Sequence, residues 1–171
     1  MALPFRLRPE AREDEDGIRA LVAAAFAQAP HGGGTEGAIV DGLRAAGALA
    51  LSLVAVDEDG GLLGHIAFSA VSVGSGENGW YGLGPVAVWP QLQRRGIGTA
   101  LVSDGLRRLK ERGAKGCVLL GDPAFYSRFG FESDPALTYR GLPSEYVQRL
   151  VFIPPAPRGE ITYHAAFEVA A

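Results

Sequence analysis

The most informative part of this chain is the stretch VAVWPQLQRRGIGTAL, residues 86–101. It begins as a short apolar strand, and its last residues have the spacing of an amphipathic helix. A helix start leaves backbone N–H groups without partners inside the helix, and the helix dipole places about half a positive charge there. Gly96 and Gly98 let an anion approach these donors, and Arg94 and Arg95 add positive charge beside them. The stretch therefore predicts a phosphate site and favours a ligand that carries a pyrophosphate.

Three kinds of glycine-rich phosphate turn could explain the spacing of Gly96 and Gly98. A P-loop requires the pattern GxxxxGK[ST], which does not occur in this chain. The dinucleotide-binding fingerprint requires a small residue where this chain has Leu101. It also follows its strand at once, whereas seven residues separate Val88 from Gly96. The third pattern, Q/R-x-x-G-x-G/A, matches residues 93–98, Gln-Arg-Arg-Gly-Ile-Gly.

The bulk composition is that of an ordinary globular protein. With 171 residues the chain is expected to form a single domain over residues 1–171, large enough to bury a sizeable core. Hydrophobic residues make up 47% of the chain and charged residues 20%, as in soluble globular proteins. A formal net charge of −3 argues against a nucleic-acid partner, which normally requires a basic surplus.

Cysteine usage and the N-terminus predict the cellular compartment. Cys117 is the only cysteine, so no disulfide forms within the chain, and its apolar neighbours favour a small buried side chain over a nucleophile. The N-terminus lacks a basic region followed by an apolar signal stretch, and no apolar run reaches membrane-spanning length. These features predict a cytoplasmic protein without a membrane partner.

Hydrophobic periodicity predicts a mixed α/β domain. Strands are expected at residues 5–8, 49–56, 62–73, 80–88 and 116–120, then around 131, at 147–153 and at 161–164. Helices are expected at residues 13–27, from an N-cap at Thr35 onward, at 98–112 and at 123–129. Residues 57–61 predict a hairpin, and the strand–helix–strand unit from 80 to 120 predicts a parallel crossover.

A second motif, GDPAFYSRFGF at residues 121–131, predicts a short capped helix. Asp122 followed by proline is typical of an N-cap, and Gly130 suits the left-handed position after a helix end. Phe125 and Phe129 are four residues apart and are expected to share a face that packs on the core. Tyr126 lies about 100° around the axis from Phe125 and can therefore point elsewhere, into a neighbouring cleft.

These motifs together resemble the GNAT superfamily of acetyl-CoA-dependent N-acetyltransferases, in particular its small single-domain bacterial members. LGPVAV, residues 83–88, is similar to the central strand of that family, and residues 93–98 and 121–131 are similar to its phosphate turn and downstream helix. The resemblance covers roughly residues 5–131. It implies a mixed, mostly antiparallel central sheet with a splayed parallel strand pair, flanked by helices.

Pro85 interrupts the central strand because proline has no N–H for a sheet hydrogen bond. The strand must be bulged or unpaired there, unless Pro85 only caps a strand that starts at Val86. The resemblance implies a cleft at this point, in which the pantetheine arm of acetyl-CoA pairs with the backbone of Val86, Ala87 and Val88. It places the pyrophosphate on the turn that follows: Arg94, Arg95, Gly96, Ile97, Gly98 and Thr99.

Tyr126 is the expected catalytic residue. A tyrosine at this place in GNAT enzymes protonates the departing thiolate of coenzyme A, and the resemblance carries that role to Tyr126. The alternative is a half-buried tyrosine whose hydroxyl bonds the backbone.

The acceptor side is less defined by the sequence. A protonated amine must lose a proton before it attacks a thioester, and a carboxylate or histidine could accept that proton. Glu36 follows the glycine run at residues 32–34, where the resemblance places the acceptor-side loop, and His65 lies on the strand next to the cleft. The alternatives are a first-turn acid that stabilises its helix and a core histidine. His31 and His164 lack the partner spacing of a metal site, so no metal is expected.

The resemblance implies an N-acetyltransferase that moves an acetyl group from acetyl-CoA to a primary amine by direct attack. The acceptor is a small-molecule or peptide amine of unknown identity. A non-catalytic acyl-CoA-binding sensor is the alternative function. The strand at residues 161–164 could form either a wall of the acceptor pocket or a homodimer contact.

Overall fold

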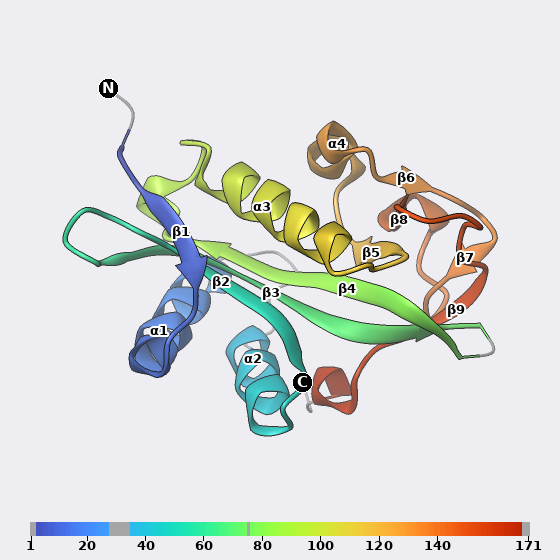
Figure 1. Ribbon diagram of the computed structural model, residues 1–171, viewed down its shortest axis with the longest axis horizontal. Coiled ribbons are helices and arrows are strands. Elements are labelled where there is room, and N and C mark those ends of the chain that lie inside the picture. The colour runs from blue at the N-terminus through green and yellow to red at the C-terminus, as the bar shows by residue number, and fades with distance from the viewer. Residues whose placement is uncertain (1–2, 28–34, 75, 169–171) are drawn as a thin grey trace.

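The computed structural model describes residues 3–27, 35–74 and 76–168, and its centre is a long twisted sheet (Figure 1). Four antiparallel strands form one half of that sheet: β1 (Arg6–Pro9), β2 (Leu49–Val56), β3 (Leu62–Val73) and β4 (Glu77–Val88). The predicted hairpin joins β2 to β3. Its Asp57 carboxylate accepts hydrogen bonds from the N–H groups of Asp59 (2.9 Å) and Gly61 (2.8 Å), which fixes the turn.

The other half of the sheet begins with the predicted parallel crossover. β4 continues through helix α3 (Ile97–Glu111) into β5 (Gly116–Leu120), which pairs in parallel with β4. β5 then pairs antiparallel with β8 (Val147–Val151), and β8 with β6 (Glu132–Ser133). Near the C-terminus, β9 (Gly159–Thr162) pairs with the end of β3 and with β7 (Leu137–Thr138).

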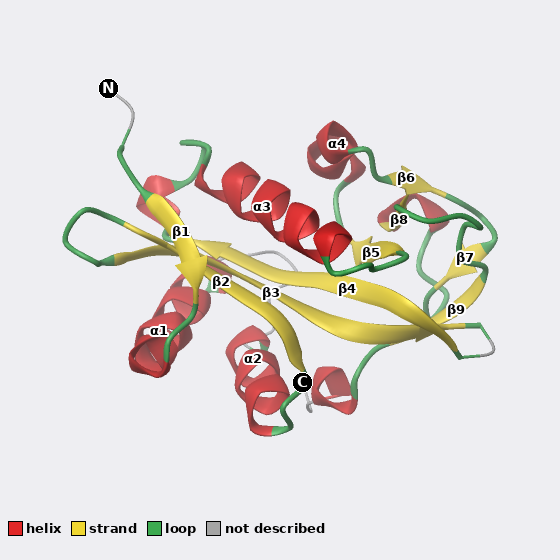
Figure 2. Ribbon diagram, in the orientation of Figure 1, coloured by secondary structure: helices red, strands yellow, loops and turns green. Residues whose placement is uncertain are grey.

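Helices cover both faces of the sheet (Figure 2). On one face lie α1 (Glu15–Phe26) and α2 (Glu36–Ala45), and on the other lie α3 and the single-turn α4 (Pro123–Tyr126). This mixed, mostly antiparallel sheet, with the parallel pair β4–β5 next to α3, confirms the expected fold class. None of the helices in the described part of the chain is long and apolar enough to cross a membrane.

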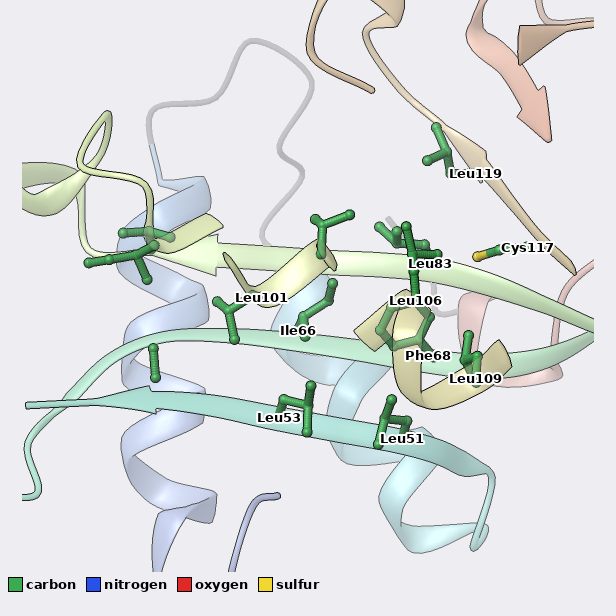
Figure 3. Packing of buried hydrophobic residues seen from close by; sticks show 14 of the residues in the cluster. Leu51, Leu53, Ile66, Phe68, Leu83, Leu101, Leu106, Leu109, Cys117 and Leu119 are labelled. Atoms are coloured by element: carbon green, nitrogen blue, oxygen red, sulfur yellow. The ribbon is translucent and has the colours of Figure 1, made fainter. Parts of the chain in front are cut away.

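The main core lies between the sheet and α3. The side chains of Leu51, Leu53, Ile66 and Phe68 project from β2 and β3 toward α3 (Figure 3). The predicted stripe of α3 meets them, and each of its residues is at most 7% exposed: Ile97, Leu101, Val102, Leu106 and Leu109. A separate apolar cluster fills the opposite face, between the sheet and α1 and α2.

Several element boundaries differ from the expectations, mostly where a helix or strand is short. The helix expected from residue 13 starts as a 3₁₀ turn at Arg12–Asp14, and the helix expected at 123–129 ends as a 3₁₀ turn at Ser127–Phe129. β7 was not predicted, because two residues carry no periodicity. The strand expected at 147–153 ends at Val151, and Ile153 is 48% exposed.

The expected cap at Thr35 is not formed. Thr35 precedes α2, but its backbone is already helical (φ −95°, ψ −11°), and its side chain makes no capping hydrogen bond. A capping side chain normally requires an extended backbone, which directs the oxygen toward the free N–H groups. The preceding glycine run, residues 32–34, and His31 lie outside the described residues.

Candidate functional site

The central strand β4 separates from its parallel neighbour beside Pro85. Pairing between β4 and β5 is present from Trp80 to Gly82, whereas β4 continues to Val88. On its other edge β4 stays paired with β3, but the register shifts so that Ala67 faces both Gly84 and Pro85. This extra residue is a β-bulge, as the missing N–H of proline predicted. The strand pair therefore splays and leaves the β5-facing edge of β4 open.

A cleft of about 670 Å³ occupies the space beyond the splay, and we call it the large cleft. It is bordered by the end of β4, the turn before α3, the start of α3 and helix α4. Its described lining residues are Val86, Val88, Leu92, Gln93, Arg94, Gly96, Ile97, Gly98, Thr99, Phe125, Tyr126 and Arg128.

The first turn of α3 faces this cleft with unused donors. Gly96 occupies the N-cap in the left-handed region (φ 86°) and offers no capping side chain. The first helical hydrogen bond is donated by Ala100 to the Gly96 carbonyl (3.0 Å). The N–H groups of Ile97, Gly98 and Thr99 precede it, and the described residues supply no backbone partner for them. An anion in the cleft would complete this helix end.

Gly98 fits the same interpretation. Its φ is not in the left-handed region, and a Cβ at this position would meet only Val88 Cγ2 at 3.9 Å, an ordinary contact. Neither the backbone nor packing within the protein therefore requires glycine here. Close approach of a ligand to the helix start would require it.

The two adjacent arginines of the turn have different positions. Arg94 lines the large cleft and holds a left-handed backbone (φ 66°), which is strained for a residue with a Cβ. Arg95 is absent from the described residues that line the cleft. A third arginine, Arg128, lines it instead, and sequence reasoning did not single it out. Its Nε donates to the Phe125 carbonyl (2.9 Å), and its guanidinium lies 4.5 Å from the centre of the Phe125 ring.

Helix α4 starts as predicted. Asp122 caps it by accepting a hydrogen bond from the Ala124 N–H (2.9 Å), and Gly130 ends the following turn in the left-handed region (φ 96°). Phe125 and Phe129 pack together with ring centres 5.5 Å apart, which confirms their shared face.

Tyr126 lies where the large cleft meets a second pocket, because it lines both. Its ring packs among the rings of Phe125, Phe129 and Phe131. The sequence had predicted that Tyr126 points away from Phe125 and Phe129, so these contacts were not expected. A Cβ on Gly121 would lie 2.8 Å from this ring, so glycine there makes room for it. Burial raises the pKa of Tyr126 to about 12, so the hydroxyl stays protonated. None of the described residues forms a hydrogen bond with that hydroxyl.

The second pocket, of about 310 Å³, is rich in aromatic side chains, and we call it the aromatic pocket. It shares Val86 and Tyr126 with the large cleft, so the two hollows meet at the splayed strand. Glu36, the first residue of α2, reaches it. Its described lining residues are Phe26, Glu36, Ile39, Leu83, Gly84, Pro85, Val86, Leu120, Tyr126, Tyr139, Tyr163 and Phe167.

Two of the expected site residues lie on the opposite face of the sheet. Ala87 belongs to the apolar cluster under α1 and α2, whereas its neighbours Val86 and Val88 face the large cleft. His65, which pairs with Ala87 in the register, is fully buried and accepts or donates a hydrogen bond at Ser52 Oγ (2.8 Å). Burial lowers the pKa of His65 to about 4, so the ring is neutral. His65 lines neither hollow, and its position favours the core-histidine alternative.

Known proteins are similar to this chain in sequence and in fold. Residues 6–133 match the family model described as an acetyltransferase (GNAT) domain. A GNAT family acetyltransferase from Brucella melitensis, solved in complex with acetyl-CoA, is 48% identical with a TM-score of 0.86, over 96% of this chain and 99% of that one. YhbS from Escherichia coli, solved with CoA, is 36% identical with a TM-score of 0.89, over 98% and 94% of the two chains.

A sequence comparison with YhbS of Escherichia coli K12, described as an uncharacterized N-acetyltransferase, gives 41% identity over 74% of this chain and 72% of that protein. The matched family region contains the splayed strand pair, the open start of α3 and Tyr126 alike. The chain therefore belongs to the GNAT family of acetyltransferases.

Proposed function

We propose that this protein transfers an acetyl group from acetyl-CoA to a primary amine. The observation that carries the proposal is the uncapped start of α3, which opens into a cleft that meets a second pocket at Tyr126. The complexes of the Brucella relative with acetyl-CoA and of YhbS with CoA support the choice of cosubstrate.

The cosubstrate would lie along β4 and end at the first turn of α3. Its pyrophosphate would accept hydrogen bonds from the N–H groups of Ile97, Gly98 and Thr99, where the helix dipole also favours negative charge. Arg94 and Arg128 would add positive charge from the two sides of the cleft. The open edge of β4 at Val86 and Val88 would pair with the amides of the pantetheine arm.

The chemistry requires no nucleophile from the protein. Acetyl-CoA supplies an activated thioester. The amine attacks its carbonyl carbon in the neutral form, the C–N bond forms as the C–S bond breaks, and the proton that the nitrogen loses passes to water. Cys117 is fully buried, and burial raises the pKa of its thiol, so it is unsuited to carry the acyl group. Tyr126 would donate its hydroxyl proton toward the sulfur that leaves, and its burial keeps that proton in place.

The experiment that tests this function combines direct binding of acetyl-CoA with release of free thiol in the presence of a panel of primary amines. We expect micromolar or tighter binding and amine-dependent thiol release. Binding without release by any amine would identify a non-catalytic acyl-CoA sensor. Absence of binding would contradict the proposal altogether.

Arg94 and Arg95 provide a matched pair for testing the phosphate site. Arg94→Ala should weaken acetyl-CoA binding about tenfold or more, because it removes a charge-assisted hydrogen bond worth about 1.5–3 kcal/mol. Arg95→Ala removes the same charge from a side chain that does not line the cleft. The affinity of this variant for acetyl-CoA should therefore stay within about twofold of the wild-type value. Calorimetry measures both constants. Equal losses in the two variants would show that overall charge acts, and not the position of Arg94.

Arg94→Gly should separate binding from stability. Glycine adopts the left-handed backbone of this position without the steric cost, so the cofactor-free variant should unfold at the same temperature as the wild type or a few degrees above it. Acetyl-CoA affinity should still fall as in Arg94→Ala. Thermal unfolding with and without acetyl-CoA measures both effects, and a lower melting temperature of the free protein would contradict the assigned strain.

A further inference from the structure

The walls of the aromatic pocket come from distant parts of the chain. Phe26 closes it from the end of α1, Tyr126 from α4, and the C-terminal segment adds Tyr139, Tyr163 and Phe167. At about 310 Å³ the pocket is at the small end of ligand sites, so it suits one compact group. Flat apolar walls of this kind favour a flat apolar ligand, because ring contacts add to the burial of apolar area.

The C-terminal wall is held in place by packing. The Tyr163 ring contacts Tyr139 (5.3 Å between centres) and Phe167 (4.8 Å). A Cβ on Gly82 would lie 2.6 Å from the Tyr163 ring, so glycine in β4 lets this ring lie directly against the strand. The guanidinium of Arg140 lies 5.3 Å from the centre of the Tyr139 ring and is paired with Glu168. These contacts form the wall before any ligand is present.

Glu36 is the one charged residue among the described lining residues of this pocket. Its Oε2 atom is buried and has no hydrogen-bond partner among those residues. A buried carboxylate oxygen without a donor is unfavourable, and a donor from a ligand would remove that penalty. The carboxylate thus provides a place for a cation inside otherwise apolar walls.

We propose that the aromatic pocket selects a primary amine carried on a flat apolar body, with Glu36 binding the ammonium group. The inference rests on the proposed function and names the class of acceptor. An aromatic body would pack against Tyr139, Tyr163 and Phe167, and the ammonium would gain from both Glu36 and the ring faces. A carboxylate next to the amine, as in an amino acid, would be buried without a cation among the described lining residues.

Binding of three small probes in the presence of CoA tests this selectivity without relying on turnover. 2-Phenylethylamine carries the ring and the amine, L-phenylalanine adds a carboxylate, and propylamine lacks the ring. We expect 2-phenylethylamine to bind about tenfold or more tightly than either of the others, because each of the others loses one of the two contacts or leaves a charge unpaired. Tighter binding of L-phenylalanine or propylamine would overturn the inference.

Two variants assign the contacts. Glu36→Gln should weaken binding of 2-phenylethylamine about tenfold or more, whereas Glu58→Gln removes the same charge from the exposed β2–β3 turn and should leave binding unchanged. Phe167 is partly exposed, so Phe167→Ala should fold. This variant should bind 2-phenylethylamine more weakly and propylamine as tightly as the wild type does. Unchanged binding in both Glu36→Gln and Phe167→Ala would overturn the assignment.

Thiol release with the same three probes and with a polyamine, spermidine, separates this inference from the proposed function. Faster release with L-phenylalanine or with a polyamine such as spermidine than with 2-phenylethylamine would contradict the acceptor class and leave the acetyltransferase activity intact. No release with any amine would contradict the proposed function, while the binding measurements would still report on the pocket.

Discussion

Replacing Tyr126 with phenylalanine should lower the rate of thiol release about 100-fold and leave acetyl-CoA affinity within about twofold of the wild type. The ring contacts with Phe125, Phe129 and Phe131 remain in this variant, so the protein should fold normally. Only the hydroxyl is lost, and with it the donor that would face the departing sulfur where the two hollows meet.

The size of this effect follows from the two proton affinities. A thiol has a pKa near 8.5, whereas burial raises the pKa of Tyr126 to about 12. Complete transfer of the proton from Tyr126 to the thiolate is therefore uphill, and most of the benefit comes from a hydrogen bond to the developing charge. This places the expected loss at the lower end of the range for general acids, which is about 10²–10⁴-fold.

Steady-state thiol release and calorimetric binding of acetyl-CoA check the prediction. Tyr146→Phe serves as the control, because it makes the same chemical change at a side chain that is 43% exposed and lines neither hollow. Between about pH 7 and pH 10 the rate of the wild type should not fall through ionisation of Tyr126, since its hydroxyl stays protonated in that range. Wild-type turnover in Tyr126→Phe would show that the hydroxyl has no catalytic role.

Replacing Gly98 with valine should weaken acetyl-CoA binding about 100-fold or more. The side chain would enter the space in front of the N–H groups of Ile97, Gly98 and Thr99 and displace the pyrophosphate from them. Each charge-assisted hydrogen bond contributes about 1.5–3 kcal/mol, so the loss of two corresponds to at least a hundredfold weaker binding. Because a Cβ at this position meets only an ordinary contact, the variant should still fold.

Gly37→Val is the matched control for this change. Gly37 is the second residue of α2, as Gly98 is of α3, and a Cβ there meets nothing within 4 Å. The two variants make the same exchange at the same helix position and therefore the same change in helix propensity, so a difference between them reports on the ligand. Equal acetyl-CoA affinity in folded Gly98→Val and Gly37→Val would contradict the assignment of the α3 start as the phosphate site.

Local sequence patterns predicted most of the fold because their causes are local. The bulge in β4 follows from the missing N–H of Pro85, and the cap of α4 follows from Asp122. Gly130 adopts the left-handed backbone that its position after the capped helix suggested. The short strand β7 and the 3₁₀ turns at the helix ends carry too few residues for a periodic signal, and there the expectations were incomplete or wrong.

The side of the sheet that a residue faces was not readable from the motif alone. Val86 and Val88 face the large cleft and Ala87 the opposite core, because side chains alternate along a strand. The same alternation places the His65 side chain on the side of the sheet that faces away from both hollows. Arg94 and Arg95 are neighbours in one turn, and only its three-dimensional path turns Arg94 toward the cleft.

By itself the sequence determined the parts that depend on a few adjacent residues: the glycine turn before α3 that we propose as the phosphate site, the bulged strand before it and the capped helix that carries Tyr126. Only the tertiary structure decided the aromatic pocket. Its walls come from Phe26, Glu36, Tyr126 and Tyr163. Two contacts bring these residues together: β9 pairs with the end of β3, and the 3₁₀ turn Ala165–Glu168 packs on α2. Residues so far apart in the chain share no pattern, because their contact depends on the packing of whole elements and on no local propensity.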